Sequence, residues 1–389
     1  MSAPSRFKIA VVVGTRPELI RLSRVLAALD RTMALTLIHT GQNYDPMLSE
    51  VFFADLAIRK PDYFLGASGK NAVQTIAQIL ERVDPVLEAV DPDALLVLGD
   101  TNSCLSVLAA KRRRIPVFHM EAGNRCFDER VPEEINRRIV DHTSDINLTY
   151  SEHARRYLLA EGLPADRVIK TGSPMYEVLH FYADRIERSN VVERLGLTPY
   201  RYIVVSAHRE ENVDAPDSLA ALGRSLERVR ERYDLPIVVS THPRTRKRLD
   251  AAGIVLDPRV RLLEPFGFLD YIQLQKHAFV VLSDSGTITE ESSILDFPAV
   301  NIRESHERPE GMDEASVPLS GLDAERIEAC IDLVTAAPRD GTRRFAIPAD
   351  YVAPNVSEKV VRLVLSYTDY VRRTVWQEAG PTFRDTDRE

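Results

Sequence analysis

The chain has 389 residues, of which 44% are hydrophobic and 28% are charged, and its formal net charge is −8 at pH 7. This length accommodates two domains of ordinary size, and the acidic balance argues against nucleic acid or an anionic membrane as the main partner. No apolar run approaches the roughly 20 residues of a membrane-spanning helix. The three scattered cysteines lack zinc-site spacing and cannot all pair, which is typical of a reducing cytoplasm.

Short β-rich runs alternate with helical stretches along the chain. The first run, residues 8–13, stops at Gly14 and is interpreted as a first strand rather than a signal peptide. Further runs, many followed by polar turns, lie at 35–39, 94–98, 117–118, 202–205, 237–239 and 280–282. Helical patterns lie between them at 19–29, 72–89 and 218–233. This alternation predicts an α/β fold with parallel sheets covered on both faces, in which ligands bind beyond the carboxyl ends of the strands.

The alternation weakens at about 174–199 and restarts at Tyr202, which indicates a joint between two similar α/β domains. We therefore predict an N-terminal domain over 1–173 and a C-terminal domain over 174–365. Apolar residues recur at helical spacing after Pro354. They predict a terminal helix, at about 366–380, that packs back on the first domain.

The turn after the first run, Gly14-Thr15-Arg16-Pro17-Glu18, opens a helix. Proline is ordinary at that position, but Arg16 would stand at a helix N-terminus, where anions bind. Arg16 is therefore a candidate phosphate ligand. The turn is neither GxGxxG nor a Walker A loop, and neither pattern occurs elsewhere, so a bound nicotinamide is not expected.

Residues 283–291 form a second strand-to-helix turn. Ser285 or Thr287 is a candidate helix cap, and Thr287 with Glu290 fits a capping box. In the functional alternative, the backbone amides of Ser285 and Gly286 hold a diphosphate with help from the helix dipole. Glu291, one turn deeper, would then accept hydrogen bonds from ribose hydroxyls.

Carboxylates and guanidiniums crowd the segment 118–145, at the end of an apolar run. They suit acid–base chemistry on an anionic substrate, although a salt-bridged surface helix is the alternative. Asp100 follows the preceding run beside Gly99, which permits close backbone approach, and Glu121 ends the neighbouring run. These two carboxylates are candidate acid and base. His208 follows another strand, and the arginine and two acids beside it favour a functional role over a purely structural one.

Two other features are interpreted without a functional role. The basic cluster 111–114 is expected at the exposed, solvated end of a helix. Cys126, inside the charged segment, is expected to be a buried or bystander thiol.

Taken in order, these clusters resemble the non-hydrolysing UDP-N-acetylglucosamine 2-epimerase family. The matching motifs cover essentially the whole chain and read GTRPE, LGDTNS, HMEAGNR, PEEINRR, SAHREEN, SDSGTITEE and ERPEG. Longer stretches, including HTGQNYD and MEAGNRCFDERVPEE, are similar to one branch, the UDP-N-acetyl-L-fucosamine synthases. That branch acts on UDP-2-acetamido-2,6-dideoxy-L-talose in capsule and O-antigen sugar pathways.

The resemblance implies two Rossmann-like domains in a glycosyltransferase-B arrangement, with the active site in the interdomain cleft. It also implies a UDP-sugar substrate, a cytoplasmic homodimer and no cofactor. By motif match, the implied catalytic residues are Asp100, Glu121, Glu133 and His208. The implied substrate-binding residues are Arg16, Arg137, Tyr271, Ser285, Gly286, Glu291 and Arg308.

The chain departs from the N-acetylglucosamine enzymes at several positions. Arg21 stands where they commonly carry lysine, Asn43 replaces the histidine of their Gln-His pair, and Gly123-Asn124-Arg125-Cys126 replaces their GLRT. Because the Gln-His pair touches an allosteric substrate site in some relatives, such regulation is not expected here. A sister branch acting on UDP-diacetamido uronic acids also carries GNRC-type motifs, so that substrate and UDP-N-acetylglucosamine remain alternatives.

The chemistry of the sugar restricts the mechanism. C2 bears an acetamido group but is not next to a carbonyl, so simple proton removal would leave an unstabilised carbanion, and oxidation would need a nicotinamide. The remaining route expels UDP from C1 as C2–H is lost, and UDP then adds back while a proton reaches the opposite face of C2. Arg16, His208 and the 285–286 turn suit diphosphate binding without a metal, and Asp100, Glu121 and Glu133 suit proton transfer.

Three rival functions share parts of this pattern. A glycosyltransferase would have the same architecture but would not exchange the C2 proton with solvent. A hydrolysing epimerase would release free N-acetylmannosamine and UDP. A catalytically idle sensor would be expected to lack a key carboxylate, yet Asp100, Glu121 and Glu133 are all present.

Overall fold

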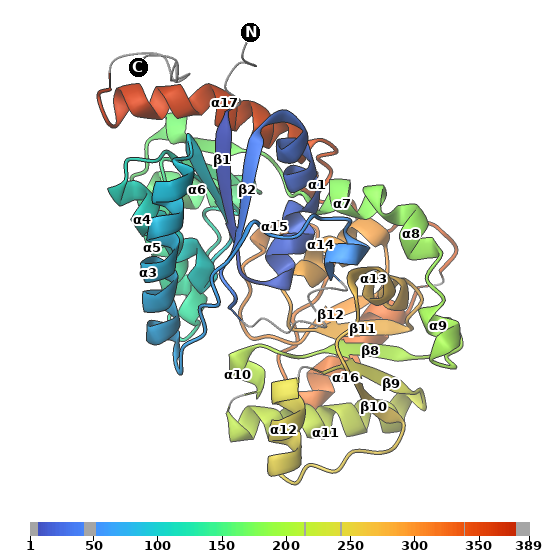
Figure 1. Ribbon diagram of the computed structural model, residues 1–389. Helices are drawn as coiled ribbons and strands as arrows, with labels where there is room; N and C mark the ends of the chain where they lie inside the picture. The colour runs from blue at the N-terminus through green and yellow to red at the C-terminus, as the bar shows by residue number, and fades with distance from the viewer. Residues whose placement is uncertain (1–6, 43–51, 214, 242, 338, 379–389) are drawn as a thin grey trace. The chain divides into compact units, whose positions relative to one another are not determined.

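The computed structural model describes residues 7–42, 52–213, 215–241, 243–337 and 339–378. The chain divides into two compact units, here called unit 1 (Met1–Val178 and Ala353–Glu389) and unit 2 (Leu179–Val352). Each unit contains a parallel β-sheet with helices packed on it (Figure 1). The predicted class, two α/β domains with parallel sheets, is confirmed.

The described part of unit 1 forms a parallel sheet in the order β3-β2-β1-β4-β5-β6-β7. Its strands are β1 (Lys8–Val13), β2 (Ala34–His39), β3 (Tyr63–Phe64), β4 (Ala94–Leu98), β5 (Val117–Met120), β6 (Ile146–Thr149) and β7 (Val168–Lys170). β1, β4 and β5 are almost wholly buried, as expected of continuous apolar strands in a parallel sheet. β1 pairs with β4, and β4 with β5, so the carboxyl ends of these three strands are neighbours.

Helices cover this sheet on both faces. The described helices of unit 1 are α1 (Arg16–Thr32), α3 (Ala72–Val90), α4 (Val107–Arg112), α5 (Pro132–Thr143), α6 (Glu152–Ala160) and α17 (Val356–Thr374), with 3-10 turns η1 (Asn102–Ser106) and η2 (Ala165–Arg167). The division between the units falls within α7 (Met175–Phe181). Residues of α3, α4 and α5 share a buried core with alternate residues of β1 and β4, and α1 lies on the other side of the strands (Figure 1). No helix in the described ranges is both long and apolar enough to cross a membrane.

The terminal helix α17 packs against α1 within unit 1. It begins at Val356, earlier than the predicted start near 366, because Val356, Val360, Val364 and Val371 form one continuous buried face. Residues 379 and 380 of the predicted range lie outside the described residues. The whole helix belongs to unit 1, so the units divide after Val178 and Val352, whereas the sequence placed the divisions after 173 and 365.

Unit 2 has a parallel sheet in the order β10-β9-β8-β11-β12. Its strands are β8 (Ile203–Ser206), β9 (Ile237–Ser240), β10 (Val260–Leu263), β11 (Val280–Ser283) and β12 (Ala299–Asn301). Its helices are α8 (Ala183–Glu187), α9 (Val191–Arg194), α10 (Glu210–Val213), α11 (Pro216–Tyr233), α12 (Pro243–Ala251), α13 (Phe268–Lys276), α14 (Thr287–Leu295), α15 (Pro309–Asp313) and α16 (Ala324–Thr335), with the 3-10 turn η3 (Ala349–Tyr351). Val205 packs in one core cluster with α11 and α16, whereas Val204 packs in another with α13 and α14, so both faces of the sheet are buried.

The last residue of β2, His39, predicts an acid sensitivity of unit 1. His39 is 2% exposed, its Nδ1 accepts a hydrogen bond from Gly41 N (3.0 Å), and its ring stacks on Phe64. Burial lowers the pKa of His39 to about 4. Unfolding frees the ring to bind a proton below about pH 6.5, so the unfolded state binds more protons between pH 6.5 and 4. We expect the free energy of unfolding to fall by about 3 kcal/mol across that window as pH decreases.

Urea unfolding at pH 7, 5.5 and 4, followed by the fluorescence of Trp376 in unit 1, measures this effect. His39→Asn is the matched control, because its side-chain oxygen can still accept from Gly41 but does not titrate. The wild type should lose more stability than this variant on acidification. An identical pH dependence of the two proteins would contradict the prediction.

Candidate active site

The turns after β1, β4 and β5 bring predicted site residues to one edge of the unit 1 sheet. Arg16 follows β1, Asp100 follows β4, and Glu121 follows β5. Because these strands are neighbours, their turns lie side by side, at the edge where parallel sheets bind ligands.

Glu121 is held by two side chains, one close to it in sequence and one from a distant part of unit 1. Its backbone has a left-handed conformation (φ 63°), which is unusual for a residue with a side chain. The Arg21 guanidinium, from α1, pairs with the Glu121 carboxylate, and the two side chains are 6% and 10% exposed. Asn124 Nδ2 donates to Glu121 Oε1 at 3.2 Å. Two of the residues at which the chain departs from the N-acetylglucosamine enzymes, Arg21 and Asn124, therefore bind the same carboxylate.

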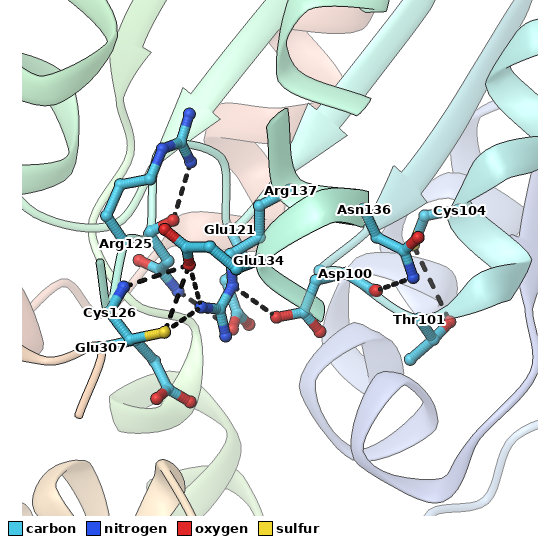
Figure 2. Close-up of polar contacts among 12 residues, drawn as sticks. Asp100, Thr101, Cys104, Glu121, Arg125, Cys126, Glu134, Asn136, Arg137 and Glu307 are labelled. Atoms are coloured by element: carbon cyan, nitrogen blue, oxygen red, sulfur yellow. Dashed lines mark hydrogen bonds and ion pairs between the residues drawn. The ribbon is translucent and has the colours of Figure 1, made fainter. Parts of the chain in front are cut away.

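Asp100 is held by residues of α5. Arg137 Nε donates to Asp100 Oδ2 at 2.8 Å, and Asn136 Nδ2 donates to the Asp100 main-chain oxygen at 2.9 Å. Arg137 also donates from Nη1 to Glu134 Oε2 at 2.7 Å, so its guanidinium lies between two carboxylates (Figure 2). Burial acts to raise the pKa of Glu134, but the Cys126 N–H and Arg137 outweigh it and hold that pKa below its usual value.

Glu134, which pairs with Arg137, was not among the residues predicted from the sequence, whereas its neighbour Glu133 was. Both glutamates begin α5, but Glu134 is 1% exposed whereas Glu133 is only partly buried. The available signal was helical phase, since Glu134 precedes Arg137 by three residues and shares its helix face.

Glu18, Cys126 and Arg16 also lie in this part of unit 1. Glu18, nearly buried, accepts from Gly14 N (2.7 Å), Thr15 N (2.6 Å) and Thr101 Oγ1 (2.9 Å), and so joins the turns after β1 and β4. Burial raises its pKa despite these donors. Burial also raises the pKa of Cys126, so its thiol is a poor nucleophile. Arg16 begins α1, with its guanidinium carbon 5.4 Å from the centre of the Phe52 ring.

In unit 2, His208 follows β8 and is placed by Asp284. Its Nδ1 lies 3.1 Å from Asp284 Oδ1, and its backbone N donates to Oδ2 at 2.9 Å. The His208 side chain is 46% exposed, whereas Asp284 is buried. Although burial acts to raise it, His208 and Arg209 hold the pKa of Asp284 below its usual value. The result is an accessible imidazole with a fixed orientation.

The turn before α14 differs from the predicted capping box. Gly286 occupies the N-cap, and the Ser285 hydroxyl lies 2.9 Å from Thr287 Oγ1 and accepts from Thr287 N at 3.4 Å. Glu290 does not close a box with Thr287, because its carboxylate accepts from Arg308 Nε at 3.4 Å. Thr287 is thus the first residue of the helix rather than its cap.

Tyr271, Glu291 and Arg308 are the more deeply placed predicted residues of unit 2. Tyr271 on α13 is partly buried against the core, and burial, with the Glu291 charge, raises its pKa. Glu291 is 6% exposed and accepts from Gln275 Nε2 at 2.9 Å. Arg308 is 2% exposed; burial opposes its charge, but Glu290 and Glu310 raise its pKa.

The structure therefore groups the predicted residues within each unit. In unit 1, Asp100 meets Arg137 directly, and Arg16 and Glu121 lie on the turns to either side of the Asp100 turn. In unit 2, Ser285, Gly286 and Glu291 share the beginning of α14, next to the Asp284 that places His208. Asn43, a departure noted in the sequence, lies outside the described residues. Within the described ranges, no group of three or more His, Cys, Asp or Glu could hold a metal ion.

Comparison with known proteins places this arrangement in a family. The family model described as UDP-N-acetylglucosamine 2-epimerase matches residues 27–365. A solved UDP-N-acetylglucosamine 2-epimerase from Rickettsia bellii is 50% identical, with a TM-score of 0.89 over 96% of this chain and 100% of that one. The Methanocaldococcus jannaschii enzyme, solved in complex with UDP-GlcNAc and UDP, is 30% identical, with a TM-score of 0.86 over 92% of this chain and 99% of that one.

The chain is also similar to a relative that is named for a different substrate. The UDP-2,3-diacetamido-2,3-dideoxy-D-glucuronate 2-epimerase of Pseudomonas aeruginosa is 35% identical over 306 residues, which cover 77% of this chain and 84% of that protein. All three proteins are named as 2-epimerases of UDP-sugars, and the Pseudomonas aeruginosa protein differs from the two solved enzymes in the sugar. The chain belongs to the UDP-N-acetylglucosamine 2-epimerase family, a family of isomerases.

Proposed function

We propose that this protein is a UDP-sugar 2-epimerase that converts UDP-2-acetamido-2,6-dideoxy-L-talose into UDP-N-acetyl-L-fucosamine. The observation that carries the choice of sugar is the pairing of Arg21 and Asn124 with Glu121. Both residues depart from the N-acetylglucosamine enzymes, and the GNRC motif containing Asn124 is part of the resemblance to the fucosamine branch. A changed set of donors on one proposed proton-transfer group is expected to change which sugar it serves.

The proposed reaction is an elimination followed by an addition. A carboxylate removes the C2 proton while the C1–O bond to UDP breaks, which gives a 2-acetamidoglycal and UDP. UDP then adds back to C1 as a second group delivers a proton to the opposite face of C2. Asp100, Glu121 and Glu133 are the proposed proton-transfer groups. Arg137 is proposed to place Asp100 and to contact the sugar nucleotide.

The leaving UDP must be held until it returns. For this we propose Arg16, His208 and the amides of Ser285 and Gly286, since charged donors and a helix N-terminus favour anions. Glu291 is proposed for the ribose hydroxyls and Tyr271 for the uracil. Because Arg308 is buried against Glu290 on α14, we propose that it supports the position of this helix under the ligand.

The resemblance also supports a setting for the enzyme. We propose that it acts in the cytoplasm as a homodimer and that its product enters the synthesis of capsule or O-antigen precursors. Sedimentation of the purified protein measures the oligomeric state independently of activity.

The uronic acid substrate is the second candidate, because the diacetamido-glucuronate enzyme is 35% identical over most of its length. The test is a panel of initial rates with three substrates: the 6-deoxy-talose compound, UDP-N-acetylglucosamine and the diacetamido uronic acid. The proposal expects the highest kcat/KM with the first. A preference for either of the others would retain the epimerase and overturn the proposed sugar.

Gly286→Ala is expected to weaken UDP binding about tenfold, the equivalent of one charge-assisted hydrogen bond. A Cβ at Gly286 would lie 2.8 Å from Glu307 Oε1. Glu307 cannot move freely, because Arg303 (2.7 Å) and Arg209 (2.9 Å) hold its two oxygens. The turn must therefore shift. Calorimetric titration with UDP measures the effect, with Ser293→Ala, further along α14, as the control. Equal affinity of Gly286→Ala and wild type would contradict the prediction.

A further inference from the structure

A buried network of charged and polar side chains lies behind the turns that carry Asp100 and Glu121. It includes His119 on β5, Asp141 near the end of α5 and Arg125 in the intervening loop. His119 Nδ1 lies 3.0 Å from Asp141 Oδ1, and Arg125 Nη1 donates to Asp141 Oδ2 at 2.7 Å. The side chains of His119, Asp141 and Arg125 are 2%, 0% and 0% exposed. Burying such groups is unfavourable unless they are paired, so this concentration needs an explanation beyond core packing.

At one end of this network, His119 contacts the Asp100 turn. His119 Nε2 lies 2.8 Å from the main-chain oxygen of Gly99, and because a carbonyl only accepts, Nε2 is the donor. Gly99 has φ 81°, and its own N–H donates to Met120 O at 3.0 Å. The peptide that links Gly99 to Asp100 is thus held from β5.

At the other end of the network, Asp141 contacts the Glu121 turn. Gly123 N donates to Asp141 Oδ1 at 3.1 Å and lies 3.3 Å from Oδ2. Glu121 has φ 63°, a conformation that persists only where its surroundings determine it. Gly123 has φ 82°, and a Cβ there would lie 2.5 Å from Ala154 O. Asp141 therefore holds this turn at a point where it packs closely against α6.

We propose that His119 and Asp141 are positioning residues that fix the Asp100 and Glu121 turns relative to each other. The roles of Asp100 and Glu121 in proton transfer rest on the proposed function. His119 and Asp141 act through hydrogen bonds to the backbone of the two turns, at Gly99 and Gly123. Since proton-transfer groups must address opposite faces of one carbon, a displacement of about 1 Å between Asp100 and Glu121 is expected to cost about 10²-fold in rate.

A matched pair of variants tests the hydrogen bond to Gly99. His119→Gln places an amide nitrogen near the position of Nε2, whereas the shorter side chain of His119→Asn reaches only as far as Nδ1. We expect His119→Asn to lose about 10²-fold in kcat, with KM little changed because ground-state binding is retained. We expect His119→Gln to retain most of the wild-type kcat. Hydrogen–deuterium exchange of peptides covering residues 99–104 should be faster in the Asn variant alone.

The outcomes are decisive in each direction. Equal kcat values in the two variants, whether near wild type or equally depressed, would overturn the proposal, as would loss of the folded state in either. If the wild type turned over no UDP-sugar, the proposed function would fail, and amide exchange would still decide the positioning role. Faster exchange only in His119→Asn would support it, and equal exchange in both variants would overturn it.

Discussion

Glu121→Gln is expected to lower kcat by at least ~10²–10⁴-fold, the usual contribution of a positioned acid or base. Glutamine has nearly the same shape but can neither take nor give a proton, and the buried Arg21 guanidinium loses its counter-charge. Asp100→Asn is expected to have an effect of the same order, because asparagine can neither take nor give a proton; its partner Arg137 keeps the second carboxylate, Glu134. UDP binding should survive in both variants, since the proposed diphosphate ligands are unchanged.

Initial rates and calorimetric titration with UDP measure the two effects separately. Glu129→Gln provides the matched control: its side chain is 78% exposed and lies 3.7 Å from Arg138 in the same charged segment. This variant should turn over substrate like the wild type. Near-wild-type turnover in both Glu121→Gln and Asp100→Asn would refute the assignment of the proton-transfer groups.

Asp141→Ala is expected to lower the free energy of unfolding of unit 1 by about 3–5 kcal/mol, the usual cost of removing one partner of a buried ion pair. The Arg125 side chain is fully buried and donates to Asp141 and, through Nε and Nη2, to Glu161 at 2.8 and 2.7 Å. Burial acts against its charge, yet Glu161 and Asp141 raise the pKa of Arg125. Because arginine is not deprotonated in proteins, Arg125 stays charged when Asp141 is removed and keeps only Glu161 as a carboxylate partner. The loss of the Gly123 contact adds to the effect.

Urea unfolding followed by fluorescence isolates this unit, because Trp376 is the single tryptophan of the chain and lies within unit 1. Glu129→Ala removes an exposed ion pair from the same segment and should cost about 0–1 kcal/mol. A loss of less than about 1 kcal/mol in Asp141→Ala would show that the buried network is not a significant source of stability.

The strands and the edge that carries the candidate site were predictable from the sequence. Buried parallel strands are continuous apolar runs, and the polar turn after each run marks its carboxyl end. This reasoning placed Arg16, Asp100, Glu121 and the 285–286 turn at strand ends, where the structure has them. Four of the seven motifs by which the family was recognised, GTRPE, LGDTNS, HMEAGNR and SDSGTITEE, overlap these same turns.

The pairing of charges was not predictable, because it depends on distant parts of the chain. Arg21 meets Glu121 across a hundred positions, and Glu290 binds Arg308, the residue before α15, instead of capping its own helix. The basic cluster 111–114 was expected to be solvated, and this was wrong for Lys111, which pairs with the buried Asp145 and lies 4.9 Å from the centre of the Trp376 ring. Local propensity says nothing about partners that tertiary packing supplies.

Proton NMR in D₂O, with the purified enzyme and UDP-2-acetamido-2,6-dideoxy-L-talose, tests the central claim most directly. Elimination and re-addition require that the C2 proton leave and that another be delivered from a group in exchange with solvent. The account predicts deuterium at C2 of a newly formed epimer that still carries UDP. Retention of the original proton at C2, or release of free sugar and UDP, would contradict it.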